Sequence, residues 1–261
     1  MLWAPGENVW LTIGGVQLEA RCWGPPPTDA PTLVLLHEGL GCVELWRDFP
    51  DRLAETTGFG VFSFSRQGYG RSDPCNLPRP IDYMECEADT VLRPVLDTAK
   101  IEKAVLIGHS DGASIAALYA GRSGDARVCG VGLIAPHFYV EDISIEAIRA
   151  ARVAYETGDL KERLARYHVN VEAAFQGWNG AWLNPEFRDW DITGCLNAIK
   201  TPVLAIQGRE DPYGTVAQVE VIADQMTAPA TVHLLDQCGH APHLEQADEA
   251  LHLILEFIAR L

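Results

Sequence analysis

The sequence lacks several features that would assign it to particular classes of protein. No apolar run approaches the roughly 20 residues that a membrane-spanning helix needs. Basic residues are scarce: 20 Lys and Arg stand against 36 Asp and Glu, a formal net charge of -16. A nucleic-acid-binding surface needs the opposite sign. The N-terminus has neither the basic start nor the apolar stretch of a secretory leader, so we expect a cytoplasmic chain.

The cysteines also lack a pattern. All seven are scattered, and no two are spaced as Cys-x-x-Cys. We therefore expect reduced, mostly buried thiols, with neither a disulfide framework nor a metal site. The expected partner is a small molecule, without nucleic acid or membrane, and a homodimer is compatible with the sequence.

Short apolar runs alternate with amphipathic stretches along most of the chain. Gly14 and Gly15 separate two strand-like segments and predict a tight antiparallel hairpin. Further strands are predicted over residues 32–37, 60–65, 103–109, 128–135, 202–208 and 230–236. The alternation predicts an α/β fold, in which a mainly parallel, twisted sheet of about eight strands carries helices on both faces.

The alternation stops over residues 139–199, which have a helical pattern, many charges and aromatics, and no convincing strand. We predict that residues 1–138 and 200–261 form the core domain and that 139–199 form an insertion over one edge of the sheet. A helix over 83–100 is expected to break or kink near Pro94.

A candidate nucleophile lies between a predicted strand and a predicted helix. Gly108, Ser110 and Gly112 fit the pattern Gly-x-Ser-x-Gly, and the strand-to-helix position is the context that this pattern requires. A sharp turn there strains the serine, and side chains at the two glycines would strike neighbouring backbone. The following helix aims free N–H groups at a developing oxyanion. A glycine-flanked turn with a serine helix cap is the structural alternative.

A serine hydroxyl needs a base within hydrogen-bond reach. His240 lies between the last predicted strand and the last helix, and Asp211 follows the strand over 202–208. Both loops lie at the carboxyl edge of the sheet, where open α/β sheets build their sites. We predict that His240 is the base and Asp211 the carboxylate that orients it. Glu210 and Asp236 are the alternative acids, the first expected to point away and the second to stay near its own strand.

The other histidines are weaker candidates. His243 is the nearest competitor and is expected to point into the following turn. His37 and His109 end strands beside the site and are expected to pack and to hydrogen-bond loops. The remaining histidines have no comparable position: His137, His168, His233 and His252.

Two backbone donors should stabilise the oxyanion, each worth roughly a hundred- to a thousandfold in rate. One is the N–H of Asp111, directly after the serine. The second should come from the loop over 37–41, where Gly39 is the best candidate because a glycine lets substrate approach the main chain closely. The same glycines could instead serve only to make a tight loop.

Five segments together resemble the α/β-hydrolase superfamily, specifically its capped branch of esterases, lactonases and carbon–carbon bond hydrolases. They are LLHEGLG, RQGYGRSDP, GHSDG, GREDPYG and CGHAPHLEQ. The resemblance covers nearly the whole chain outside 139–199. It implies the triad Ser110, Asp211 and His240, in the chain order that this architecture uses.

The chain departs from the usual family pattern in three places. Glu38 stands where the family usually has glycine, Asp111 follows the nucleophile where many relatives carry an uncharged residue, and RQGYGRS replaces the commoner RGxGxS. The first two add negative charge near the reaction centre. We expect them to disfavour anionic substrates.

The resemblance also implies that residues 139–199 form a helical cap. Its large aromatics either face the pocket, where they would bind an apolar acyl or alcohol group, or pack the cap onto the core. They are Phe175, Trp178, Trp182, Phe187 and Trp190. Its arginines are expected to face solvent, unless one binds a substrate carboxylate: Arg149, Arg152, Arg163 and Arg166.

The favoured function is hydrolysis of a carboxylic ester or lactone through an acyl-enzyme on Ser110, with no cofactor or metal required. One alternative is a hydrolase that cleaves a carbon–carbon bond in a ring-cleavage product with the same triad. Another is a ligand-binding receptor on the same fold. Dehalogenases and epoxide hydrolases of this fold need an acidic nucleophile where Ser110 stands.

Overall fold

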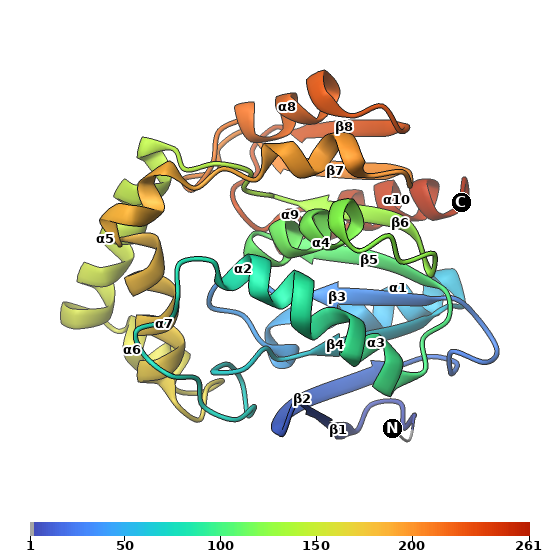
Figure 1. Cartoon of the computed structure of the whole chain (residues 1–261), viewed down its shortest axis with the longest axis horizontal. Coiled ribbons are helices and arrows are strands. Elements are labelled where there is room, and N and C mark those ends of the chain that lie inside the picture. Colours follow the sequence, from blue (N-terminus) through green and yellow to red (C-terminus); the bar gives the residue numbers. More distant parts are fainter. Residues whose placement is uncertain (1–2) are drawn as a thin grey trace.

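The alternation of apolar and amphipathic segments folds into one mixed sheet in the computed structural model, which describes residues 3–261 (Figure 1). Within these residues the sheet has eight strands, in the order β1-β2-β4-β3-β5-β6-β7-β8. They are β1 Asn8–Ile13, β2 Val16–Trp23, β3 Thr32–Leu36, β4 Gly60–Phe64, β5 Ala104–His109, β6 Val128–Ile134, β7 Val203–Gly208 and β8 Ala230–Leu235. The predicted fold class is confirmed.

The sheet is antiparallel at one edge and parallel elsewhere. β1 and β2 form the predicted hairpin, and both turn residues, Gly14 and Gly15, have positive φ (58° and 87°), as a type I′ turn requires. β2 also pairs antiparallel with β4. Every pair from β4 through β3 to β8 is parallel, so the ends of these strands gather loops at one edge.

Alternate side chains of each central strand enter different hydrophobic clusters. Leu33 and Leu35 of β3 pack with α1 and α10 on one face of the sheet, whereas Val34 and Leu36 pack with α3, α4 and α8 on the other. These helices are α1 Phe49–Thr57, α3 Leu92–Ala99, α4 Asp111–Arg122, α8 Ala217–Gln225 and α10 Ala247–Ile258. None of the helices in residues 3–261 has both the length and the apolarity needed to cross a membrane.

The helix expected over 83–100 is interrupted earlier than predicted. A short helix, α2 (Tyr83–Cys86), leads into a π-helical turn over Glu87–Val91 before α3 begins. Pro94 supplies no N–H for the carbonyl four residues before it, and the wide turn lies directly on that side. The interruption therefore takes the form of a π-turn rather than a kink at the proline.

The segment between β6 and β7 contains three helices, α5 (Asp142–Thr157), α6 (Leu160–Leu164) and α7 (Val171–Trp182). They stand together beside the sheet, at the left of Figure 1. Shorter 3-10 turns follow over Pro185–Asp189 and Thr193–Ala198. Residues 139–199 are called the cap segment below.

The first turn of α4 lies directly against the end of β3. A Cβ added at Gly112 would strike the backbone carbonyls of Leu36 and His37, and one added at Gly108 would strike the carbonyl of Gly112. Since the obstacles are backbone atoms, they cannot rotate away. Both positions therefore require glycine, as the sequence indicated.

Gly112→Ala should lower the free energy of unfolding by about 1–3 kcal/mol or more, because the added methyl group overpacks a backbone contact. Gly180→Ala in α7 is the matched control, since a Cβ there meets nothing within 4 Å. That control should gain about 0.5–1 kcal/mol. Urea unfolding of both variants measures the difference, and a Gly112→Ala protein as stable as wild type would contradict this packing.

Candidate active site

Ser110 occupies the turn between β5 and α4, with φ 53° and ψ -120°. A positive φ at a non-glycine residue costs about 1–3 kcal/mol and persists only where the surroundings enforce it. Here the backbone N–H of Ser110 is held by the carbonyl of Ile134 at 2.9 Å, and its own carbonyl accepts the N–H of Ala113 at 2.8 Å. The strained turn expected from the Gly-x-Ser-x-Gly pattern is present.

The loops after β7 and β8 bring Asp211 and His240 into contact. Nδ1 of His240 lies 2.7 Å from Oδ2 of Asp211. The same carboxylate accepts hydrogen bonds from the Gln207 side chain (2.9 Å) and the Tyr213 N–H (2.8 Å). Because a carboxylate only accepts, Nδ1 holds the hydrogen and Nε2 is left to accept a proton.

The Asp211 carboxylate is charged despite its burial. Burial alone would raise the pKa of Asp211, but hydrogen bonds from His240 and from the Tyr213 N–H outweigh it and hold the pKa below its usual value. An ionised carboxylate at this place stabilises a histidine that takes up a proton.

The two alternative acids lie elsewhere. Glu210 accepts the backbone N–H of Cys238 at 2.9 Å. Asp236 is exposed and pairs with Arg209 at 2.8 Å. Asp211 is thus the one of these three carboxylates that contacts His240.

The competing histidines pack as side chains of the core. His243 is buried, with its ring centroid 5.0 Å from that of Trp46 and 5.4 Å from that of Phe49. Nε2 of His37 accepts the backbone N–H of Arg66 at 3.0 Å. These contacts are structural, as expected for His37, whereas His243 packs into the core more deeply than predicted.

Ser110 and His240 line the same cavity, of about 110 Å³. Its walls come from the loop after β3, the start of α4, the loops after β6, β7 and β8, and the cap segment. The lining residues are Glu38, Gly39, Leu40, Ser110, Asp111, His137, Ile148, Trp178, Trp182, Tyr213 and His240. Four of the five predicted site residues therefore line this one cavity, and the fifth, Asp211, contacts His240.

Gly39 and Asp111, the predicted oxyanion donors, both border this cavity. A Cβ on Gly39 would strike the indole of Trp178, so the cap segment lies directly on this loop. Asp111 is the first residue of α4, where backbone N–H groups have no partner inside the helix. Their positions suit donors to an oxygen bound beside Ser110.

The Asp111 side chain does not add an exposed charge to the cavity. It is fully buried and accepts a hydrogen bond from the Tyr83 hydroxyl, which in turn accepts the indole N–H of Trp182 at 3.0 Å. Burial raises the pKa of Asp111. The Asp111 carboxyl group, expected to add a second negative charge to the cavity, is instead the end of a buried hydrogen-bonded chain. Glu38 remains partly exposed to the cavity.

The prediction that His137 has no position comparable to that of His240 is wrong. It follows β6 at the carboxyl edge and lines the cavity, with its ring 5.7 Å from that of His240. Burial lowers the pKa of His137 to about 3, so it is neutral at pH 7. Its place after a strand was the signal that could have identified it. Tyr213, two residues after Asp211 in the loop that follows β7, also lines the cavity and was missed.

The cap aromatics divide between the two expected roles. Trp178 and Trp182, four residues apart on α7, face the cavity. Phe187 stacks on Trp190 at 5.1 Å, and Phe175 stacks on Tyr155 at 3.7 Å, away from it. None of the cap arginines, Arg188 included, is among the described residues that line the cavity. Arg149, Arg163 and Arg166 are exposed, as expected, while Arg152 is half-buried and donates to Asn179.

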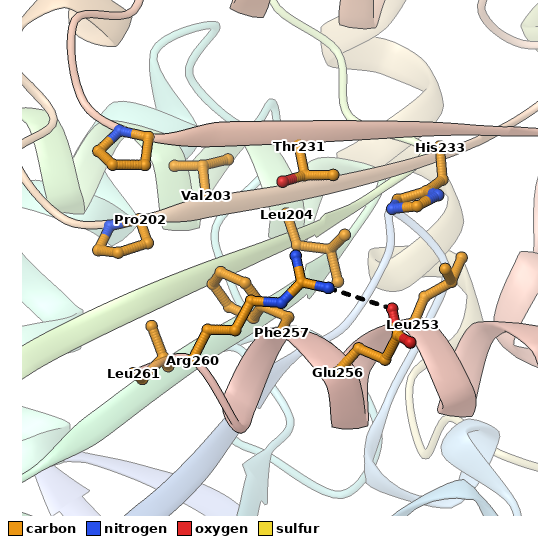
Figure 2. A pocket seen from close by; sticks show the side chains of 11 residues that line it. Pro202, Val203, Leu204, Thr231, His233, Leu253, Glu256, Phe257, Arg260 and Leu261 are labelled. Atoms are coloured by element: carbon orange, nitrogen blue, oxygen red, sulfur yellow. Dashed lines mark hydrogen bonds and ion pairs between the residues drawn. The ribbon is translucent and has the colours of Figure 1, made fainter.

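A second hollow, of about 260 Å³, lies at the opposite end of β7 from Asp211 (Figure 2). It is bounded by the start of β7, by β8 and by α10, and its one drawn ion pair joins Glu256 to Arg260. It shares no lining residue with the cavity at Ser110. Among residues 3–261, no three His, Cys, Asp or Glu side chains are grouped so that they could hold a metal ion.

Comparison with known families decides the classification. The model of the alpha/beta hydrolase family matches residues 33–252, most of the chain. The chain belongs to the alpha/beta hydrolase family. This confirms the resemblance inferred from the five sequence segments.

Individual relatives of this alpha/beta hydrolase are distant. Epoxide hydrolase B of Mycobacterium tuberculosis is 30% identical over 128 residues, which are 48% of this chain and 35% of that protein. The 2-hydroxy-6-oxononadienedioate/2-hydroxy-6-oxononatrienedioate hydrolase of Paraburkholderia phymatum is 25% identical, covering 98% of this chain and 96% of the relative. The enol-lactonase of Burkholderia xenovorans LB400 has a similar fold, with a TM-score of 0.76, 22% identity, and coverage of 96% and 100%.

The buried neutral His137 predicts a pH dependence of stability. Its folded pKa of about 3 lies below the unfolded value of about 6.5, so between these values the unfolded chain binds the extra proton. Stability is therefore lost as the pH falls below 6.5. From pH 7 to pH 5, His137 should account for about 2 kcal/mol of this loss.

Chemical unfolding at pH 7 and pH 5 measures the effect. His137→Gln should lose about 2 kcal/mol less than wild type between the two pH values. His252→Gln, at an exposed ring, should behave as wild type does. An equal loss in His137→Gln and wild type would show that His137 is not held neutral.

Proposed function

We propose that this protein is a serine hydrolase that cleaves a small, uncharged carboxylic ester or lactone. The observation that carries the proposal is the shared cavity: Ser110 on its strained turn and His240, held by Asp211, border the same space. This arrangement supplies a nucleophile, a base and an orienting carboxylate.

The reaction follows from these positions. Ser110 Oγ attacks the ester carbonyl while Nε2 of His240 takes its proton, and the N–H groups of Gly39 and Asp111 bind the oxyanion. The leaving alkoxide takes that proton from His240, and the acyl group stays on Ser110. Water, deprotonated by His240, then attacks the acyl-enzyme, and the proton returns to Ser110 as the acid departs. In a lactone, the alcohol and the acid belong to one product.

The cavity sets the size and charge of the substrate. At about 110 Å³, the cavity is small beside the roughly 300–1,000 Å³ of most small-molecule sites, which favours a short acyl group. The cap segment contributes Ile148, Trp178 and Trp182, an apolar wall. No Lys or Arg lines this cavity in the part of the chain that the structure describes, while Glu38 does. A substrate carboxylate would therefore find no lysine or arginine side chain among the described residues that line this cavity.

The relatives support this choice in different degrees. Similarity to an enol-lactonase structure agrees with a lactone as substrate. The dienedioate hydrolase is named for a dicarboxylate, and its type of carbon–carbon cleavage is the second candidate, which the lack of a basic group in the cavity disfavours. Epoxide hydrolases of this fold use an acidic nucleophile, whereas this chain has Ser110 there. Catalytic turnover of any ester by this protein would exclude the other alternative, a receptor that only binds its ligand.

Ser110→Ala should lower kcat/KM for p-nitrophenyl acetate about a thousandfold or more, because the nucleophile is lost. Ser123→Ala, at the other end of α4, is the matched control and should keep wild-type activity. Steady-state release of p-nitrophenol measures both. Turnover by Ser110→Ala at the wild-type rate would contradict the proposal.

Acyl chain length should be limited by the cavity wall. Wild type should prefer p-nitrophenyl acetate to hexanoate, and Ile148→Ala should raise the hexanoate-to-acetate ratio of kcat/KM by about tenfold or more, since one methylene in a tight pocket is worth 10–200-fold. Ile145→Ala, one turn earlier on α5 and outside this cavity, is the control. The pocket assignment fails if both variants change the ratio equally.

A further inference from the structure

Glu38 is the charged residue of the cavity that the proposed reaction does not use. It directly precedes Gly39, and its carboxylate is partly exposed to the cavity (28%). Oε2 of Glu38 lies 3.5 Å from Nδ1 of His109. His109 in turn directly precedes Ser110, at the end of β5, and its side chain is almost fully buried (4% exposed).

The other ring nitrogen of His109 fixes the position of its hydrogen. Nε2 lies 2.7 Å from the backbone carbonyl oxygen of His240. A carbonyl only accepts hydrogen bonds, so Nε2 must donate. Nδ1 is then the nitrogen that faces Glu38, and it has no hydrogen-bond partner among the described residues, so the Glu38 carboxylate at 3.5 Å is its nearest charged group.

A neutral His109 would point the lone pair of Nδ1 at the Glu38 carboxylate, in a buried place where such repulsion is poorly screened. A proton on Nδ1 converts the same contact into a charge-assisted pair. Burial acts to raise the pKa of Glu38, but the interaction with His109 outweighs it and lowers the pKa. Glu38 is therefore held as a carboxylate.

The groups around this pair do not supply a competing charge. The His243 ring lies 4.6 Å from that of His109, and burial keeps the pKa of His243 well below its usual value. The His240 ring lies 5.1 Å away. On the other side, Arg66 donates to the backbone carbonyl of Glu38 at 2.9 Å rather than to its carboxylate. Of the groups around it, His109 is thus the one whose ring nitrogen faces the Glu38 carboxylate.

We propose that Glu38 and His109 form a second acid–histidine pair, with hydrogens on both ring nitrogens of His109, which positions the catalytic loop of His240. The kinetic part of this inference rests on the proposed hydrolase function. The pair joins three segments: the loop carrying Gly39, the turn carrying Ser110, and the loop carrying His240. Glu38 fixes the ring of His109 through Nδ1, and the same ring, through Nε2, fixes the backbone carbonyl of His240, the proposed base.

The Glu38–His109 pair is predicted to align His240 and to take no part in the chemical steps. His240 must keep both its contact with Asp211 and its reach to Ser110, and a displacement of about 1 Å in such a site can cost about a hundredfold in rate. Because Nε2 of His109 holds the carbonyl of the same residue, losing this hydrogen bond frees the loop without removing any reacting group.

Nitrogen-15 NMR of the histidine side chains at pH 7 tests the pair without any substrate. His109 should show hydrogens on both ring nitrogens, and its signals are assigned by their loss in His109→Gln. In Glu38→Gln the amide can donate to Nδ1, so His109 should become neutral with hydrogen on Nε2 alone. A neutral His109 in wild type would overturn the pair.

Kinetics with an ester tests the positioning role. His109→Leu removes the donor to the His240 carbonyl and should lower kcat about 10–100-fold with KM within about threefold of wild type. His109→Gln keeps an N–H donor and should stay within about fivefold of wild-type kcat. Equal losses in the two variants, with melting temperatures equal to each other, would show that His109 only fills space and would overturn the positioning role.

The two arms separate failure of this inference from failure of the proposed function. If wild type hydrolyses no ester but His109 carries both hydrogens, the pair stands and the ester-hydrolase assignment falls. If wild type is active and His109 is neutral, the assignment stands and the pair falls.

Discussion

The backbone turn at Ser110 is the constraint on which the site depends. A serine at φ 53° is tolerated because the end of β5 and the start of α4 are fixed by glycines that touch backbone directly. Gly112 lets α4 begin against the end of β3, and this brings the loop after β3 beside Ser110. The parallel order of β3, β5, β6, β7 and β8 then delivers the other loops to the same edge. Strain at one residue is therefore compensated by packing along the central strands.

The electrostatics of the site follow from this geometry in a chain with a net charge of -16. Each carboxylate near Ser110 has its own partner. Asp211 accepts hydrogen bonds from His240 and neighbouring groups, Asp111 is buried against Tyr83, and Glu38 faces His109. No cation among the described cavity residues is left to bind a substrate carboxylate. Under the proposed function, this arrangement disfavours anionic substrates.

Local sequence patterns were sufficient to predict much of this architecture. Turn chemistry at Gly14 and Gly15, apolar runs for the strands, and the glycines around Ser110 each depend on nearby residues, and each was predictable. Asp211 and His240 could be placed at one edge because parallel strands end together. These inferences need the order of the elements but no detailed packing.

The features that were missed depend on contacts between distant segments. His137 faces the cavity only because the cap segment and the loop after β7 close around it. The partner of Asp111, Tyr83, comes from α2, a helix whose boundary with a π-turn was not predictable from Pro94 alone. Likewise, nothing in the sequence shows that His109 contacts the main chain of His240, 131 positions away.

The most direct test of the central claim, that Ser110 is an activated nucleophile, is covalent labelling with a fluorophosphonate followed by intact-mass and peptide mass spectrometry. An activated serine displaces fluoride and keeps the phosphonyl group. We predict one adduct per chain, on the peptide containing Ser110, with none in Ser110→Ala and much slower labelling in His240→Ala. Absence of an adduct, or an adduct at another residue, would contradict the account.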